Sequence, residues 1–214
     1  MIKKSIIISF LIILSFSLNV FADDSDYVDI GMTFNNEESN NGVIYGESFY
    51  LIQDENLLET NADKIEFSLE NGYRLQIGEA YSNYDDFVKA YADILKFDSP
   101  LSIGFDSDYK IYTSAFTSIE EANEYKGLLS DKTDLQLELV HINDKVCIDT
   151  ENMDIIVDND VVLKNNRLTF SYDGNKYRGD IKFYVYYGKI SFINHLKVND
   201  YLYGVVPREM DTDW

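Results

Sequence analysis

The segment RLQIGEAY, residues 74–81, decides how the middle of this chain folds. Its apolar side chains Leu75 and Ile77 alternate with the polar side chains Arg74 and Gln76. Side chains alternate across a strand, so this pattern predicts a strand that is buried on one face only. The elements on either side follow from that strand.

Two helices are expected after it. Asn83 with Asp86 three residues later can cap the first helix, and Ser118 with Glu121 forms a capping-box pair for the second. Apolar side chains recur at helical spacing behind both caps. They are Phe87, Val88, Tyr91, Ile94 and Leu95 in the first helix, and Ile119, Ala122, Tyr125, Leu128 and Leu129 in the second.

A hairpin lies between the helices and a strand follows them. Residues 101–105 and 109–115 are strand-like runs joined by a polar turn, and residues 135–139 alternate between apolar and polar side chains. The order from residue 73 to 141 is therefore β-α-β-β-α-β, which favours an antiparallel sheet with both helices on one face. That face would carry Leu75, Ile77, Ile111 and Leu137, and the open face would carry Arg74, Gln76, Lys110 and Tyr112.

Strand patterns also precede and follow this module. Short β-prone runs occur between residues 30 and 69 and end at a predicted turn, Glu70–Gly72. From residue 145 further runs follow, with a hairpin turn at Asp173-Gly174. We interpret the dense Tyr and Phe residues of the segment 170–192 as core packing. The sequence thus predicts an α+β fold that is mostly antiparallel β.

Charge and composition exclude several classes of partner. The chain has 214 residues and a formal net charge of −20. Such a negative surface repels nucleic acid and anionic lipid, whereas it still permits neutral polysaccharides. Cys147 is the single cysteine, so it has no partner for an internal disulfide, and we expect it to be a small buried residue. No Cys and His spacing indicates a metal site, and no cofactor motif is present.

The first 22 residues are typical of an export signal. Two lysines precede an apolar run, residues 6–18, and a small residue, Ala22, precedes the first acidic pair. We expect residues 1–22 to be a signal peptide and the rest to lie outside the cytoplasmic membrane. A retained membrane anchor is the open alternative.

The closing stretch INHLKVNDYLYGVVPREM, residues 193–210, holds the candidate catalytic residue. Tyr201–Val206 is β-prone, and Pro207 is expected to end a strand there because proline lacks a backbone donor. Glu209 follows directly. A carboxylic acid beside large apolar side chains can acquire a raised pKa, which suits a general acid.

This stretch resembles the signature of the stage II sporulation protein D (SpoIID/LytB) family. The segments IGMTF (30–34), GESFYLI (46–52) and YDGNKYRGDIKF (172–183) are similar to other parts of that domain. The resemblance implies a peptidoglycan lytic transglycosylase with Glu209 as its catalytic acid. Because the family's domain continues beyond the motif, we expect this chain to be a C-terminally truncated fragment with weak activity or none.

The middle module resembles a SPOR domain. RLQIGEAYS (74–82) and YKIYTSAFTSIEEA (109–122) are similar to its strand segments, although Ser114-Ala115 replaces the usual Gly-Pro. The resemblance implies binding to glycan strands without stem peptides, and the candidate contacts are the open-face residues Arg74, Gln76, Lys110 and Tyr112. The expected organisation is a β part (23–72), this module (73–142) and a β part ending in the motif (143–214).

Two functions stay open at this point. One is an exported enzyme of sporulation and cell-wall remodelling that cleaves peptidoglycan. The other is a non-catalytic cell-wall protein that binds glycan strands through the SPOR-like module. Glycan strands are the expected partner in both cases, and other cell-wall hydrolases are a second class of partner.

Overall fold

The computed structural model describes residues 26–32, 40–96 and 100–209, which form two units. One unit is Asp29–His195, and the other combines the flanking segments, of which residues 26–28 and 196–209 are described. The predicted signal peptide, residues 1–22, lies outside the described residues. No helix in the described part has the length and apolar character of a membrane span.

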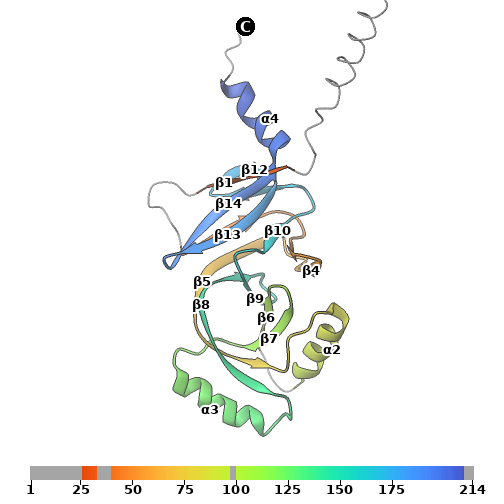
Figure 1. Ribbon diagram of the computed structural model, residues 1–214, viewed down its shortest axis with the longest axis vertical. Helices are drawn as coiled ribbons and strands as arrows, with labels where there is room; N and C mark the ends of the chain where they lie inside the picture. Colours follow the sequence, from red (N-terminus) through yellow and green to blue (C-terminus); the bar gives the residue numbers. More distant parts are fainter. Residues whose placement is uncertain (1–25, 33–39, 97–99, 210–214) are drawn as a thin grey trace, which may run out of the picture. The chain divides into compact units, whose positions relative to one another are not determined.

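The fold is α+β and mostly antiparallel, as the sequence predicted (Figure 1). A six-stranded sheet has the order β1 (Tyr27–Gly31), β14 (Lys189–Lys197), β13 (Asp180–Tyr186), β10 (Val162–Lys164), β3 (Tyr50–Gln53) and β4 (Asn56–Glu59). An eight-stranded sheet has the order β12 (Asn175–Arg178), β11 (Thr169–Tyr172), β2 (Asn41–Tyr45), β5 (Lys64–Ile77), β7 (Tyr109–Thr113), β6 (Leu101–Phe105), β9 (Asp154–Val157) and β8 (Leu137–Asp149).

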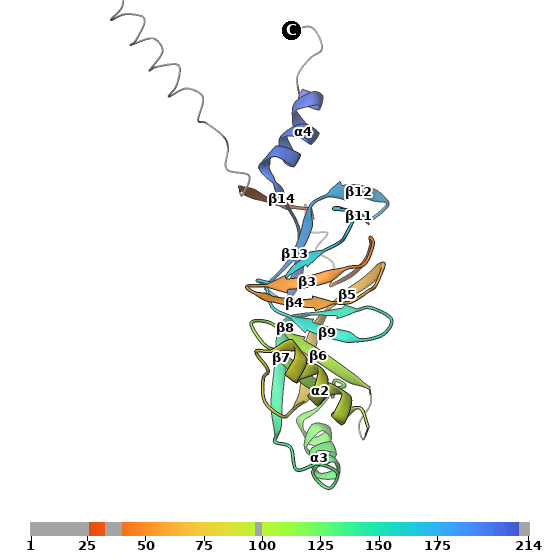
Figure 2. The same cartoon turned by 90° about the vertical axis from the view of Figure 1, so that its right-hand side faces the viewer.

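The predicted β-α-β-β-α-β order is confirmed. It consists of β5, α2 (Tyr84–Ile94), β6, β7, α3 (Ile119–Ser130) and β8, and Figures 1 and 2 show both helices beside these strands. The Asn83 side chain accepts hydrogen bonds from the backbone N–H groups of Asp85 and Asp86, and the Ser118 hydroxyl accepts one from Glu121. Both helices therefore begin where their caps predicted.

The predicted turn at Glu70–Gly72 is wrong, because β5 continues through it. The pairing of β5 with β8 shifts register between Glu70 and Gly72, which marks a bulge. The Asn71 side chain accepts a hydrogen bond from the backbone N–H of Asp144 on the opposite strand. Turn-forming residues thus make an irregularity inside a long ribbon. β5 and β8 cross the predicted domain boundaries at 72/73 and 142/143, and the domain division itself stays a prediction.

The pairings of five strands close a ring. β5 pairs with β7, β7 with β6, β6 in parallel with β9, β9 with β8, and β8 again with β5. Because α2 contacts β7 and α3 contacts β5 and β8 from outside, the opposite faces of these strands turn inward. A small apolar cluster lies on that inner face, formed by Tyr112, Ile142, Cys147 and Ile156. The predicted open face is therefore the inside of a ring.

The aromatic residues of the segment 170–192 divide between core and surface. Phe170, Phe183 and Phe192 are buried and belong to the main core, as predicted. Tyr184, Tyr186 and Tyr187 are exposed, and Tyr187 in the β13–β14 turn reaches 86% exposure. The core interpretation is thus confirmed for the phenylalanines, whereas these three tyrosines face solvent.

Candidate functional site

Glu209, the predicted catalytic residue, is the last residue of α4 (Val198–Glu209). The prediction of a strand over Tyr201–Val206 is wrong, since this run is helical. Asp200 in the first turn of α4 carries negative charge near the helix N-terminus, which favours the helix, and β propensity is a weak and context-dependent preference. The Glu209 side chain lies outside what the structure describes, so its predicted role as catalytic acid stays a prediction.

The four predicted glycan contacts do not form an open surface. The helix-covered face is as predicted, with Leu75, Ile77, Ile111 and Leu137 all buried. On the other face, however, Arg74 is 2% exposed and Tyr112 is 6% exposed, so their predicted placement on an open face is wrong. Gln76 and Lys110 are half-buried. The physical reason is β9, which closes the ring over this face. Glycan contact by the four residues stays a prediction.

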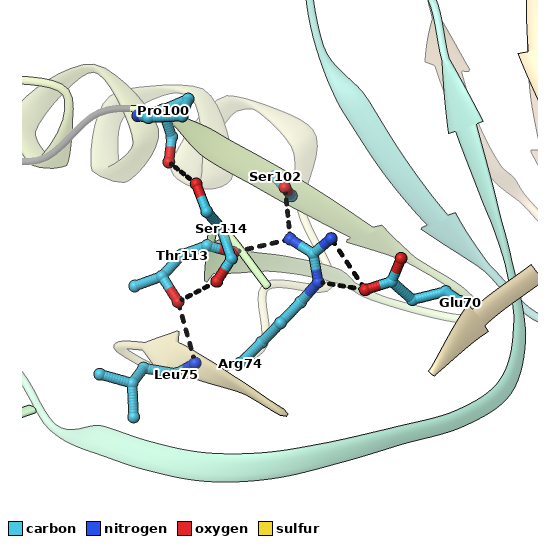
Figure 3. Close-up of polar contacts among 7 residues, drawn as sticks. All are labelled: Glu70, Arg74, Leu75, Pro100, Ser102, Thr113 and Ser114. Carbon is cyan, nitrogen blue, oxygen red and sulfur yellow. Dashed lines mark hydrogen bonds and ion pairs between the residues drawn. The ribbon is translucent and has the colours of Figure 1, made fainter. Parts of the chain in front are cut away.

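Arg74 forms a buried polar network inside the ring (Figure 3). Its Nη1 donates to the Ser102 hydroxyl and to the Thr113 carbonyl, each at 2.7 Å. Its Nε and Nη2 lie 3.1 and 3.0 Å from Glu70 Oε1, and the Glu70 side chain is only 14% exposed. Four of the five N–H donors of this guanidinium thus hold β5, β6 and β7 together, which leaves it little capacity for a ligand.

Cys147 also lies in the ring interior. Burial raises the pKa of the Cys147 thiol to about 12, with the negative charge of Asp154 adding to the effect. A thiol with such a pKa carries almost no thiolate at neutral pH, so the expectation of a buried cysteine is confirmed and the thiol is inert. A cavity of about 40 Å³ is lined by Tyr112, Asp106 and the Lys145–Asp158 ion pair, among other residues. Its size suits a water molecule or two.

A charged cluster joins β1 to the strands beside it. Asp29 Oδ1 lies 2.5 Å from His195 Nδ1, and Asp29 Oδ2 lies 3.2 Å from Lys182 Nζ. Partial burial by itself raises the pKa of Asp29, but the hydrogen bonds and charges of His195 and Lys182 outweigh it and hold the pKa below its ordinary 3.8. The ionised form of Asp29 is therefore favoured by folding.

Asp29→Asn is expected to lower the free energy of unfolding at neutral pH by less than about 1 kcal/mol, because the Asp29 side chain is 48% exposed and screened by solvent. Because the pKa of Asp29 is lower in the folded state, the carboxylate stabilises the fold at pH values above its ordinary pKa of 3.8, and this contribution is lost as the pH falls through the folded-state pKa. The difference between variant and wild type in urea unfolding should thus shrink on acidification. Asp134→Asn, at an exposed position, is the control. A difference that grows on acidification would contradict the assignment.

The structure also contains an open groove that the sequence analysis did not predict. It measures about 500 Å³ and lies between β4, the start of α2 and the β6–β7 hairpin. Its lining residues are Glu55, Asn56, Leu57, Glu59, Ser82, Asn83, Tyr84 and Tyr109. These residues come from three separate segments, so no local motif could have revealed them. Asn83 was predicted only as a helix cap.

Hydrogen bonds fix the floor of this groove. The Tyr109 hydroxyl donates to the Leu57 carbonyl at 2.9 Å and accepts from the Leu57 N–H at 3.2 Å. Asn56 Nδ2 donates to the Ser107 carbonyl at 2.5 Å. β4 is thereby tied to the β6–β7 hairpin. Among the side chains that the structure describes, no three His, Cys, Asp or Glu residues gather as metal ligands, in the groove or elsewhere.

Comparisons with protein-family models, with curated proteins and with solved structures return no match. The resemblance to the SpoIID/LytB and SPOR families therefore rests on the residues quoted from this sequence.

Proposed function

We propose that this chain is an exported cell-wall protein that binds peptidoglycan glycan strands and cleaves them in the manner of a lytic transglycosylase. The observation that carries the proposal is the run of residues 193–210, which resembles the SpoIID/LytB signature over its whole length. This run begins in β14 and continues directly into α4, so that Glu209 follows at the helix end.

In this mechanism one carboxyl group does two jobs. Glu209 first donates its proton to the glycosidic oxygen, and the bond from that oxygen to the muramic acid C1 breaks. The resulting carboxylate then takes the proton from the muramic C6 hydroxyl while the oxygen of that hydroxyl attacks C1. This attack closes an anhydro ring, and the proton transfer regenerates the carboxylic acid of Glu209. General acid–base catalysis of this kind contributes roughly 10²–10⁴-fold. Positioning of the glycan supplies the remainder.

Glu209→Gln is expected to reduce the release of anhydro-muropeptides from purified sacculi by about 100-fold, because the amide cannot donate or take the proton. The products are measured by chromatography and mass spectrometry after incubation with purified protein. Glu124→Gln, the same change at an exposed position of α3, is the matched control and should leave the products unchanged. Equal amounts of products from wild type and Glu209→Gln would contradict the role of Glu209.

The second candidate is a non-catalytic protein that binds glycan strands. The open groove beside Tyr84 supports this second candidate, because glycan binding in that groove would not need Glu209. This candidate would be supported over the enzyme if wild type and Glu209→Gln bound sacculi equally well and neither protein released anhydro-muropeptides.

A further inference from the structure

We propose that the groove between β4 and the start of α2 is the glycan-binding site of this chain, with the Tyr84 ring as the stacking surface and the Glu55 and Glu59 carboxylates as acceptors for sugar hydroxyl and amide groups. The identification of the sugar as peptidoglycan glycan rests on the proposed function. The groove, its lining and its chemistry stand on the geometry.

The aromatic wall of the groove is exposed but held in place. Tyr84 is 45% exposed, and its ring centroid lies 5.5 Å from that of Tyr109 and 6.1 Å from that of Phe87. Tyr109 and Phe87 are both buried, so they hold the Tyr84 ring from one side while its other parts meet solvent. An aromatic surface with a fixed orientation loses little conformational freedom on binding, as a stacking site for the apolar face of a sugar requires.

The polar groups of the groove suit a neutral ligand rich in donors. Glu55 and Glu59 are exposed, and within the described part of the chain neither carboxylate forms a hydrogen bond or an ion pair. Ser82 adds a hydroxyl that can donate or accept. The described lining contains no Lys or Arg, so phosphate, sulfate and carboxylate groups are repelled, and the groove suits an uncharged N-acetylglucosamine unit of the strand rather than the lactyl carboxylate of a muramic acid unit. Hydroxyl and acetamide groups, in contrast, can donate to both carboxylates.

The size and construction of the groove also suit an oligosaccharide. A volume of about 500 Å³ lies within the range of roughly 300–1,000 Å³ that is usual for ligand sites. The Tyr109 hydroxyl and Asn56 tie β4 to the hairpin, and backbone hydrogen bonds between Tyr81 and Tyr109 tie the segment before α2 to the same hairpin, so the two sides of the groove are set before any ligand arrives.

The test measures binding of the whole chain to amidase-treated sacculi and to a soluble hexamer of β-1,4-linked N-acetylglucosamine. Tyr84→Ala is expected to weaken binding about 10-fold, the scale of one lost aromatic contact. Glu59→Gln, which keeps the shape of an exposed side chain, should weaken it several-fold and guards against a folding defect in the first variant. Tyr187→Ala removes a more exposed tyrosine far along the chain and should leave binding unchanged.

The outcomes separate the groove from the function. If wild type binds neither probe, the proposed glycan function fails. If wild type binds and folded Tyr84→Ala and Glu59→Gln bind equally well, the groove assignment fails while the function stands. Raising NaCl from about 50 to about 300 mM should leave the affinity for the hexamer unchanged, because this sugar is uncharged. A steep loss of hexamer binding with salt would mean that charged contacts carry the binding, and it would overturn the neutral-glycan assignment.

Discussion

Arg74→Met is expected to lower the free energy of unfolding by about 3–5 kcal/mol, the usual cost of removing one partner from a buried ion pair. The Arg74 side chain is 3% exposed, so its loss leaves the Glu70 carboxylate with little water and no counter-charge. The Thr113 carbonyl and the Ser102 hydroxyl lose their donor as well. Urea unfolding followed by circular dichroism measures the change.

A double variant tests this explanation. Arg74→Met combined with Glu70→Met should recover much of the loss, because an apolar pair leaves no charge unpaired in the ring. Lys89→Met, which breaks an exposed ion pair with Asp86 on α2, is the control and should cost less than about 0.5 kcal/mol. If Arg74→Met left stability intact but weakened glycan binding, Arg74 would be a ligand contact as the sequence predicted.

Arg74 also shows where prediction from the sequence stopped. Alternation in residues 74–81 gave the strand, its buried face and the helices that cover it, because these depend on local periodicity and caps. Whether the other face is exposed or buried depends on β9, which pairs in parallel with β6, some fifty positions earlier in the chain. No local pattern encodes such a pairing. An open polar face and the lining of a closed ring have the same alternation, and only the tertiary fold distinguishes them.

The closing motif shows a different limit. Tyr201–Val206 contains β-branched and aromatic residues, so local propensity favours a strand. The structure has a helix there, with Asp200 in its first turn and Pro207 in its last. Identification of Glu209 depended on the order of residues rather than on secondary structure, so the correction leaves that prediction in place. The groove beside Tyr84 had no sequence signal, since its walls meet only after folding.

Phe192→Ala is expected to be as damaging as Arg74→Met, at about 3–5 kcal/mol, because it removes a large buried ring from a well-packed core. Phe192 is 1% exposed. Its ring centroid lies 4.4 Å from that of Tyr172, 5.7 Å from Phe67 and 5.8 Å from Phe183. Tyr172 and Phe67 belong to the eight-stranded sheet, whereas Phe192 and Phe183 belong to the six-stranded sheet. The deletion therefore leaves a cavity where the two sheets pack.

The control for this variant lies on the same sheet. Tyr184 follows Phe183 on β13, points to the opposite face and is 49% exposed, so Tyr184→Ala should cost less than about 1 kcal/mol. Both variants are compared by urea unfolding. A loss below about 1.5 kcal/mol for Phe192→Ala would mean that the sheets do not depend on this contact. β4 of the six-stranded sheet forms one side of the groove. Phe192→Ala should therefore also weaken glycan binding indirectly, because less of the protein is folded. Lowering the temperature, which stabilises the fold, should restore glycan binding.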